Sequence, residues 1–146
     1  MKVRLSNSSV SATNKSIQLE SIRKIYEAQF QYYQIAHSEE NLTTQLLISD
    51  SNEKQLTVSE LNQINDWLQQ LDQIVQQQSI FDTTVFREVL SIVWYKCCQR
   101  ATVGGLALKK VYDQSPYRDR VISPFLRRTL FMKSFAKQLL RKLNLR

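Results

Sequence analysis

Both cysteines and both glycines of the chain fall within residues 93–110, in the stretch VWYKCCQRATVGGLALKK. Paired thiols can ligate metals or exchange electrons, and glycines ahead of Lys109 and Lys110 could cradle a phosphate. Both motifs are incomplete, because adjacent cysteines on a helix diverge by about 100° and a phosphate loop needs G-x-x-x-x-G-K-[ST] after a strand. We therefore expect Cys97 and Cys98 in or beside the core, and Gly104-Gly105 as a left-handed helix stop. The glycine amides could still contact a single backbone phosphate.

Residues suited to catalysis are scarce elsewhere in the chain. The only histidine is His37, which we expect at the surface or as a cap at the end of a helix. Glu39-Glu40 lies in a polar stretch, which disfavours the raised pKa that acid-base catalysis needs. No spacing suggests a zinc site or a catalytic triad. We predict a non-enzymatic protein without metal or cofactor, and an enzyme with an unrecognised site stays an alternative.

The basic residues of the C-terminal third carry the strongest functional signal. Lys133, Lys137 and Arg141 recur every fourth residue, so they form one stripe along a helix. Such a stripe neutralises phosphates in a salt-sensitive, sequence-independent manner. Tyr117 could add a stacking platform for bases. The predicted nucleic-acid-binding residues are Lys109, Lys110, Arg118, Arg120, Arg127, Arg128, Lys133, Lys137, Arg141 and Lys142.

Charge divides the chain into two halves. Residues 1–86 hold 6 Lys and Arg against 10 Asp and Glu, a net charge of −4, whereas residues 87–146 hold 14 against 3, a net charge of +11. A polyanion is the partner expected on the basic half, with protein subunits, including copies of this chain, as further partners. Docking of the basic helix on an acidic protein is the main alternative, and binding to a membrane surface is another. No apolar run is long enough to span a bilayer.

Glycine and proline are too scarce for a protein built on tight hairpins, since there are only two of each in 146 residues. We therefore predict an all-α, compact bundle of five or six helices over residues 17–146. Residues 1–16 are predicted to be a disordered basic tail, with a targeting segment as the alternative. Unpaired cysteines and the lack of a secretory signal favour the cytoplasm.

Helix boundaries and packing faces can be read from several patterns. Helices are expected after Ser16, around residues 42–48, and from Thr57, whose spacing to Glu60 forms a capping box. Asp82 is the expected cap of a further helix, a shorter helix follows Gly105, and Ser123-Pro124 opens the last. The positions expected on the packing faces are Ile22, Ile25, Tyr26, Gln29, Tyr33 and Ala36; then Leu61, Ile64, Leu68, Leu71 and Val75; then Phe86, Val89, Leu90, Val93, Cys97 and Ala101; and Leu126, Leu130, Phe131, Phe135 and Leu139.

As a whole, the chain resembles the small subunits of CRISPR effector complexes. The resemblance lies in the helical run poor in glycine and proline, the apolar seam of residues 61–75 and the basic stretch of residues 118–146. It implies a non-catalytic helical bundle that lines a ribonucleoprotein complex and holds nucleic acid on a basic face. The resemblance also implies that the acidic half of one copy contacts the basic half of a neighbouring copy or the large subunit.

Overall fold

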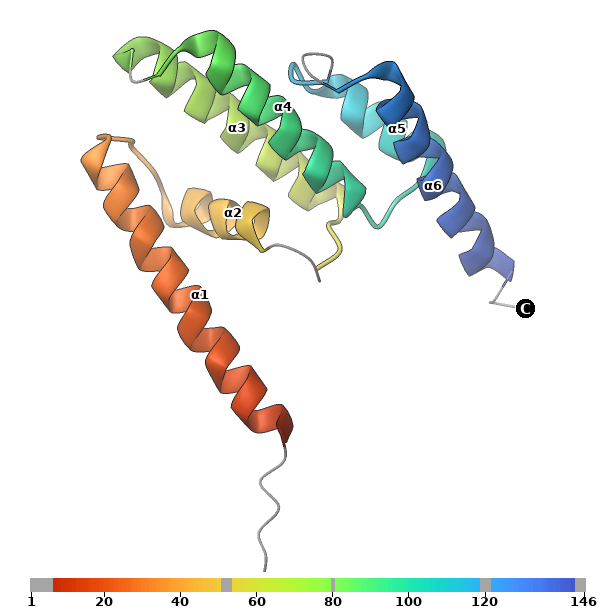
Figure 1. Cartoon of the computed structure of the whole chain (residues 1–146), viewed down its shortest axis with the longest axis horizontal. Helices are drawn as coiled ribbons and strands as arrows, with labels where there is room; N and C mark the ends of the chain where they lie inside the picture. Colours follow the sequence, from red (N-terminus) through yellow and green to blue (C-terminus); the bar gives the residue numbers. More distant parts are fainter. Residues whose placement is uncertain (1–6, 51–53, 80, 119–121, 144–146) are drawn as a thin grey trace, which may run out of the picture. The chain divides into compact units, whose positions relative to one another are not determined.

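The computed structural model describes the backbone of residues 7–50, 54–79, 81–118 and 122–143, and the side chains of these ranges between residues 16 and 134. Six helices make up this part of the chain, which confirms the all-α class (Figure 1). Within these ranges the extended backbone forms an isolated bridge but no strand. The helices are α1 (Asn7–Tyr32), α2 (Glu39–Ser49), α3 (Val58–Gln78), α4 (Thr83–Gln99), α5 (Gly105–Gln114) and α6 (Pro124–Leu143).

The chain divides into two compact units, Met1–Leu47 and Ile48–Arg146. The single bundle over residues 17–146 therefore stays a prediction. The expected start of the first helix is wrong, because α1 begins at Asn7 rather than after Ser16, and the disordered tail stays a prediction. Residues 7–16 contain no glycine or proline, and each Ser, Asn or Thr costs only about 0.5 kcal/mol in a helix. An established helix therefore extends through them.

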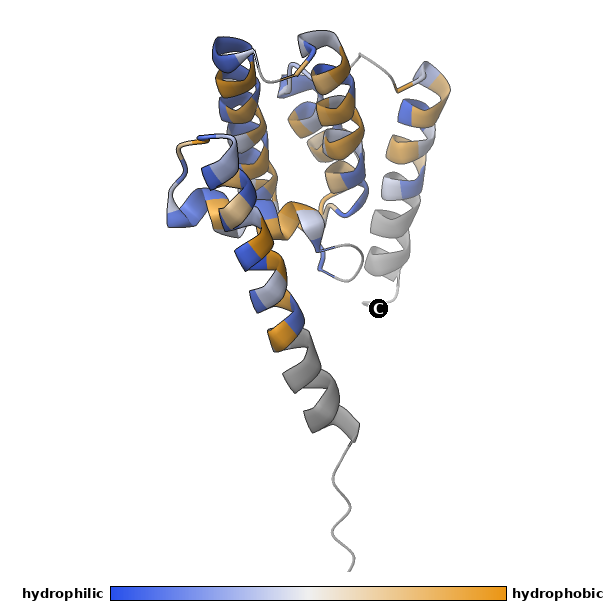
Figure 2. Ribbon diagram, turned by 60° about the vertical axis from the view of Figure 1, so that its left-hand side comes forward, coloured by the Kyte–Doolittle hydropathy of each residue, from blue (hydrophilic) through white to orange (hydrophobic). Residues whose placement is uncertain are grey.

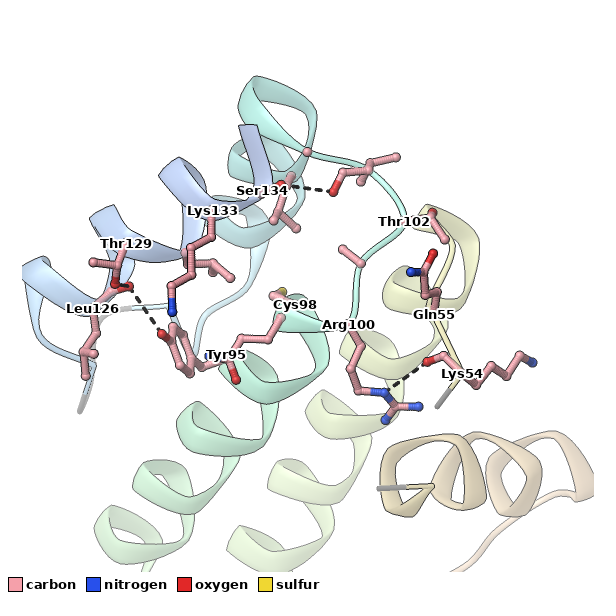
Figure 3. Close-up of a pocket in the computed structure, with 16 residues that line it drawn as sticks. Lys54, Gln55, Tyr95, Cys98, Arg100, Thr102, Leu126, Thr129, Lys133 and Ser134 are labelled. Atoms are coloured by element: carbon pink, nitrogen blue, oxygen red, sulfur yellow. Dashed lines mark hydrogen bonds between the residues drawn. The ribbon is translucent and has the colours of Figure 1, made fainter. Parts of the chain in front are cut away.

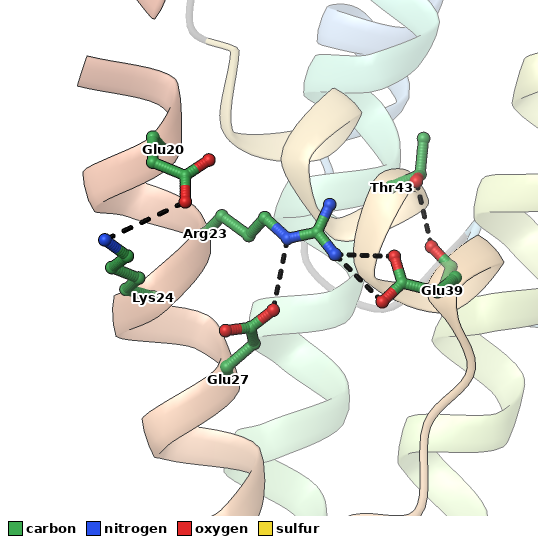
Figure 4. Close-up of polar contacts among 6 residues, drawn as sticks. All are labelled: Glu20, Arg23, Lys24, Glu27, Glu39 and Thr43. Atoms are coloured by element: carbon green, nitrogen blue, oxygen red, sulfur yellow. Dashed lines mark hydrogen bonds and ion pairs between the residues drawn. The ribbon is translucent and has the colours of Figure 1, made fainter. Parts of the chain in front are cut away.

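The first unit is held together by polar contacts between α1 and the start of α2. The Arg23 guanidinium donates to both carboxylate oxygens of Glu39, at 2.8 and 2.6 Å, and to Glu27 at 3.1 Å (Figure 4). Among the described side chains of α1, Phe30 is buried, whereas Ile25, expected to pack, is 55% exposed. His37 lies at the surface as predicted, with its ring centroid 4.8 Å from that of Phe30.

The second unit contains α3, which begins and packs as the sequence predicts. The Thr57 hydroxyl accepts from the Glu60 amide at 3.2 Å, and the Glu60 carboxylate accepts from the Thr57 amide at 2.8 Å. Lys54, followed by the Thr57 backbone, lowers the pKa of the Glu60 carboxyl to about 2. All five residues of the predicted seam are buried: Leu61, Ile64, Leu68, Leu71 and Val75.

Helix α4 packs along α3 and supplies the centre of the core. Asp82 caps it as predicted, accepting from the Val85 amide at 2.9 Å. Trp94 is fully buried, and its indole N–H donates to the Tyr112 carbonyl at 3.3 Å. Val89, predicted to pack, is 48% exposed, because the buried side of α4 follows Leu90, Trp94 and the cysteines.

The predicted glycine stop is wrong. Helix α4 ends at Gln99, and Arg100 is its cap, with φ of −90°. Residues after the cap are extended because Leu56 and Ala101 form a parallel bridge, in which the Leu56 amide donates to Arg100 and the Thr102 amide donates to Leu56, both at 2.8 Å. Gly104 instead caps the start of α5, so the glycines begin a helix rather than end one.

Helices α5 and α6 pack side by side against this core (Figure 1). As predicted, Ser123 accepts from the Leu126 amide at 3.3 Å and Pro124 is the first residue of α6. Leu130 is buried and Phe131 packs on the core, but Leu126 is 45% exposed. The side chains of Phe135 and Leu139 lie outside the described residues. Apolar residues recur along each helix of this unit (Figure 2), and α6 also turns Phe125 and Met132 to solvent.

Candidate nucleic-acid interface

A groove of about 470 Å³ lies between the C-terminal end of α4, the loop that follows it, and one side of α6 (Figure 3). Its lining comes from residues 54–55, from Tyr95, from residues 98–104, from Leu108, and from α6 at positions 126, 129, 130, 133 and 134. The charged residues among these are Lys54, Arg100 and Lys133, and no carboxylate lies among them. Glu60, which is not part of the lining, pairs with Lys54, so the excess positive charge of the groove comes from Arg100 and Lys133.

The three cations differ in their surroundings. The Lys54 ammonium lies 2.8 Å from Glu60. Arg100 donates from Nε to the Lys54 carbonyl at 3.2 Å and from Nη1 to the Ile48 carbonyl at 3.4 Å, so it also fastens the chain that leads into α3. Lys133 is exposed, and no ion pair joins it to another described residue. Lys133 is therefore the cation of the groove with the most freedom to meet a ligand.

One backbone bridge and two hydrogen bonds from side-chain hydroxyls hold the walls of the groove together. The bridge between Leu56 and Ala101 joins the segment before α3 to the loop after α4. The Tyr95 hydroxyl donates to the Leu126 carbonyl at 3.3 Å, and the Ser134 hydroxyl donates to the Val103 carbonyl at 3.3 Å (Figure 3). These two bonds fix α6 at both ends of the wall that carries Thr129 and Lys133.

The predicted basic residues of α5 and the following loop form a separate cluster. Lys109 forms an ion pair with Asp113 one turn later. Arg118 donates to the Asp113 carbonyl at 2.6 Å, and Lys110 is exposed on the same helix. None of these three residues lines the groove. Arg120 lies outside the described residues.

On α6 the predicted stripe is only partly described. Helical backbone runs to Leu143, so positions 133, 137 and 141 follow one another at successive turns as expected. Arg128 is exposed and Arg127 is half-buried, and neither lines the groove. The side chains of Lys137, Arg141 and Lys142 lie outside the described residues. The structure therefore places one predicted residue, Lys133, in the groove.

Tyr117 does not serve as a stacking platform, contrary to the prediction, because it is buried. Its hydroxyl donates to the Leu68 carbonyl at 3.2 Å and lies 3.4 Å from Asp72, while its carbonyl accepts from Ser91 at 2.7 Å. The loop is drawn inward because the aromatic ring fills the core beside α3 and α4. The exposed aromatic residue of this region is Phe125, which is 73% exposed.

Two cations of the groove, Lys54 and Arg100, were missed by sequence reasoning. They lie far apart in the chain, and neither belongs to a basic run. Their proximity depends on the Leu56–Ala101 bridge, which has no sequence signature. The only available signal was that Arg100 stands two residues after the buried Cys98, at the end of a helix.

The adjacent cysteines are buried and unpaired with each other, as predicted. Burial raises the pKa of the Cys97 thiol to about 11. Burial, with Cys97 as neighbour, raises the pKa of Cys98 well above its usual value. Because the thiolate is the reactive species, these cysteines are poorly suited to nucleophilic or redox chemistry.

Both thiols should therefore resist alkylation in the native protein. Iodoacetamide at neutral pH should label neither Cys97 nor Cys98, and both should react once urea unfolds the chain, as read by intact mass. The unfolded sample serves as the control for reagent activity. Rapid labelling of either thiol under native conditions would contradict the burial seen here.

Comparison with protein-family models, with curated proteins and with solved structures found no match to this chain. Among the described helices, none combines the length and the apolar character required to cross a membrane. Within the same residues, no cluster of three or more His, Cys, Asp or Glu side chains could hold a metal ion. The groove is therefore the feature on which a function can be proposed.

Proposed function

We propose that this chain is a non-catalytic subunit of a larger assembly and binds the phosphate backbone of a nucleic acid along α6 and the groove beside it. The observation that carries the proposal is the lining of the groove, which holds no carboxylate and whose excess positive charge comes from Arg100 and Lys133, since Glu60 pairs with Lys54. The net charge of +11 over residues 87–146 adds long-range attraction for a polyanion.

Binding is proposed to be independent of base sequence. Lysine and arginine contacts to phosphates fix the position of a nucleic acid but do not distinguish bases. The side-chain amides of Gln55 and Gln99 also line the groove and can donate to phosphate or sugar oxygens, whereas the Thr129 hydroxyl donates to the Leu126 carbonyl at 2.7 Å. This supports a nucleic-acid partner held by its backbone.

Membership of an assembly is supported by apolar side chains that α6 leaves exposed. Phe125 is 73% exposed, Met132 is 62% exposed and Leu126 is 45% exposed. Exposed apolar residues gathered on one helix are typical of protein interfaces. The resemblance to CRISPR small subunits adds one candidate assembly, and genes for effector subunits beside the gene for this chain would support it.

A titration with single- and double-stranded DNA and RNA at two salt concentrations tests the proposal. The logarithm of the affinity should fall with that of the salt concentration, by about 0.7 to 0.9 per phosphate contacted. Lys133→Glu should weaken binding to all sequences alike and reduce the salt slope by about 1. Reversal of Lys133, Lys137 and Arg141 together should abolish binding while the circular dichroism spectrum is retained.

Lys24→Glu provides the matched control, because it makes the same charge change on an exposed lysine of α1. Its affinity should stay close to that of the parent protein. If the Lys24 and Lys133 variants lose equal affinity, binding depends only on the total charge of the protein, which would contradict a site on α6. Absence of binding at low salt would overturn the proposal as a whole.

Docking on an acidic protein is the second candidate function. It is favoured by the same exposed residues Phe125 and Met132, which lie beside cationic Arg128 on α6. A protein partner would bury these side chains, whereas backbone phosphates would leave them in water. If nucleic acid fails to bind at low salt, this candidate takes precedence, and Met132→Glu should then disrupt the assembly isolated from cells.

A further inference from the structure

The interior of the groove is apolar, although cations lie at its rim. All of its described lining belongs to the second unit. Cys98, Leu108 and Leu130 are buried side chains of this lining, and the half-buried ring of Tyr95 lies among them. Phosphate groups are charged and gain nothing from an apolar surface. The interior therefore indicates that the ligand carries a flat or apolar group besides its phosphate.

Tyr95 is held in a fixed orientation between α4 and α6. Its hydroxyl donates to the Leu126 carbonyl at 3.3 Å, which restricts the rotation of the ring. Among the described residues of the lining, Tyr95 is the aromatic one. A side chain that is already ordered loses little entropy when a ligand binds to it. Tyr95 is therefore suited to receive a planar group of the ligand.

Polar groups of two kinds lie near this ring. Figure 3 shows the Lys133 side chain reaching from α6 toward Tyr95. Gln99, the last residue of α4, is exposed and also lines the groove, and its amide can both donate to and accept from the edge of a base. The groove thus combines a ring for the face of a base, an amide for its edge and an ammonium group for its phosphate.

The size of the groove limits what can enter it. Its volume of about 470 Å³ lies within the range of about 300–1,000 Å³ that is typical of sites for small organic groups. Bases within a duplex are stacked on their neighbours, whereas unpaired bases can be splayed out and stacked on aromatic side chains. Only an unpaired base can therefore place its face on Tyr95.

We propose that the groove binds one unpaired nucleotide of a single strand, with its base stacked on Tyr95 and its phosphate at Lys133. This mode of binding rests on the proposed function and narrows the partner to single-stranded nucleic acid. Discrimination between bases is not expected, because every base has a face that can stack. Stacking in the groove is therefore compatible with contacts to the backbone that do not depend on sequence.

An abasic strand separates stacking from contacts to the backbone. An oligothymidylate and an abasic deoxyribose-phosphate strand of equal length carry the same phosphates, but only the first has bases. At equal salt the full chain should bind the oligothymidylate about tenfold more tightly, the effect of one stacked base. This comparison uses the parent protein, so it does not depend on the folding of a variant.

Tyr95→Leu should remove this tenfold preference and leave the affinity for the abasic strand and for a DNA duplex unchanged. The dependence on salt should also be unchanged, since no phosphate contact is lost. Tyr95→Phe loses the hydrogen bond to Leu126 but keeps the ring, so it should retain the preference. Phe125→Leu is the matched control, because it removes an exposed ring of α6 that does not line the groove; it should bind both strands as the parent does.

The possible failures are distinguishable. Equal affinity of the parent for the two strands would overturn the stacked base and leave the proposed function in place. Equal losses on both strands in Tyr95→Leu would give Tyr95 a structural role and overturn the stacked base as well. Thymidine monophosphate that displaces the strand at the strand's own concentration would assign the groove to a free nucleotide instead. Absence of binding to every strand at low salt would overturn the proposed function and the stacked base together.

Discussion

An Asp72→Ala variant should lose about 1.5–3 kcal/mol of unfolding free energy, the range for hydrogen bonds to a charged group, because the Arg87 side chain left behind is 29% exposed. The Asp72 carboxylate on α3 accepts from Arg87 Nε on α4 through both oxygens, at 3.0 and 2.9 Å. The buried Tyr117 hydroxyl lies 3.4 Å from the same carboxylate. Alanine would leave the guanidinium and the phenol without this acceptor inside the protein.

Urea denaturation followed by circular dichroism measures this loss. Asp66→Ala is the matched control, because Asp66 lies exposed on the same helix, and it should change stability by no more than about 0.5 kcal/mol. An Asp72→Leu, Arg87→Met double variant should recover most of the loss, since apolar side chains can replace a buried pair. Equal stabilities of the Asp72 and Asp66 variants would show that the pair is not a structural link.

Replacing Gly104 with alanine should destabilise the second unit by about 1–3 kcal/mol, the cost of overpacking a well-filled site. The backbone at Gly104 is extended, with φ of −136° and ψ of 179°, so its conformation is open to other residues. The conflict is one of space, because a Cβ atom there would lie 2.6 Å from both the backbone oxygen and the Oγ of Ser134. Helix α6 would have to move outward.

Movement of α6 would also alter the groove, since Gly104 and Ser134 both line it. Thermal unfolding measures the loss of stability, and the nucleic-acid titration measures the effect on the groove. Ser134→Ala combined with Gly104→Ala should not restore stability, because the backbone oxygen of residue 134 stays in place. Full rescue by Ser134→Ala would show that only the hydroxyl is in conflict and that α6 need not move.

The sequence was most informative where a local pattern decides the structure. The Thr57–Glu60 capping box, the Asp82 cap and the Ser123-Pro124 start each depend on residues within one helical turn, and all three are confirmed. The α3 seam was equally readable, because one helix face must be buried.

Prediction failed where a local signal competed with a distant contact. Gly104-Gly105 reads as a helix stop, but the pairing of Leu56 with Ala101 ends α4 at Gln99. Tyr117 stands among basic residues and reads as exposed, yet its ring and hydroxyl are held by α3 and α4. Spacing alone identifies neither Leu56 as the partner of Ala101 nor Leu68 as the partner of Tyr117.

The candidate site also combines features that the sequence predicts with features that depend on tertiary contacts. The sequence by itself determined the helical class, the basic character of residues 87–146 and the presence of Lys133 on a cationic helix stripe, since these depend on composition and helical period. Only the tertiary structure decided that Lys133 shares a groove with Lys54 and Arg100, because a single backbone bridge and two side-chain bonds to α6 bring those segments together. Contacts between residues so far apart in the chain arise from packing, which no local pattern records.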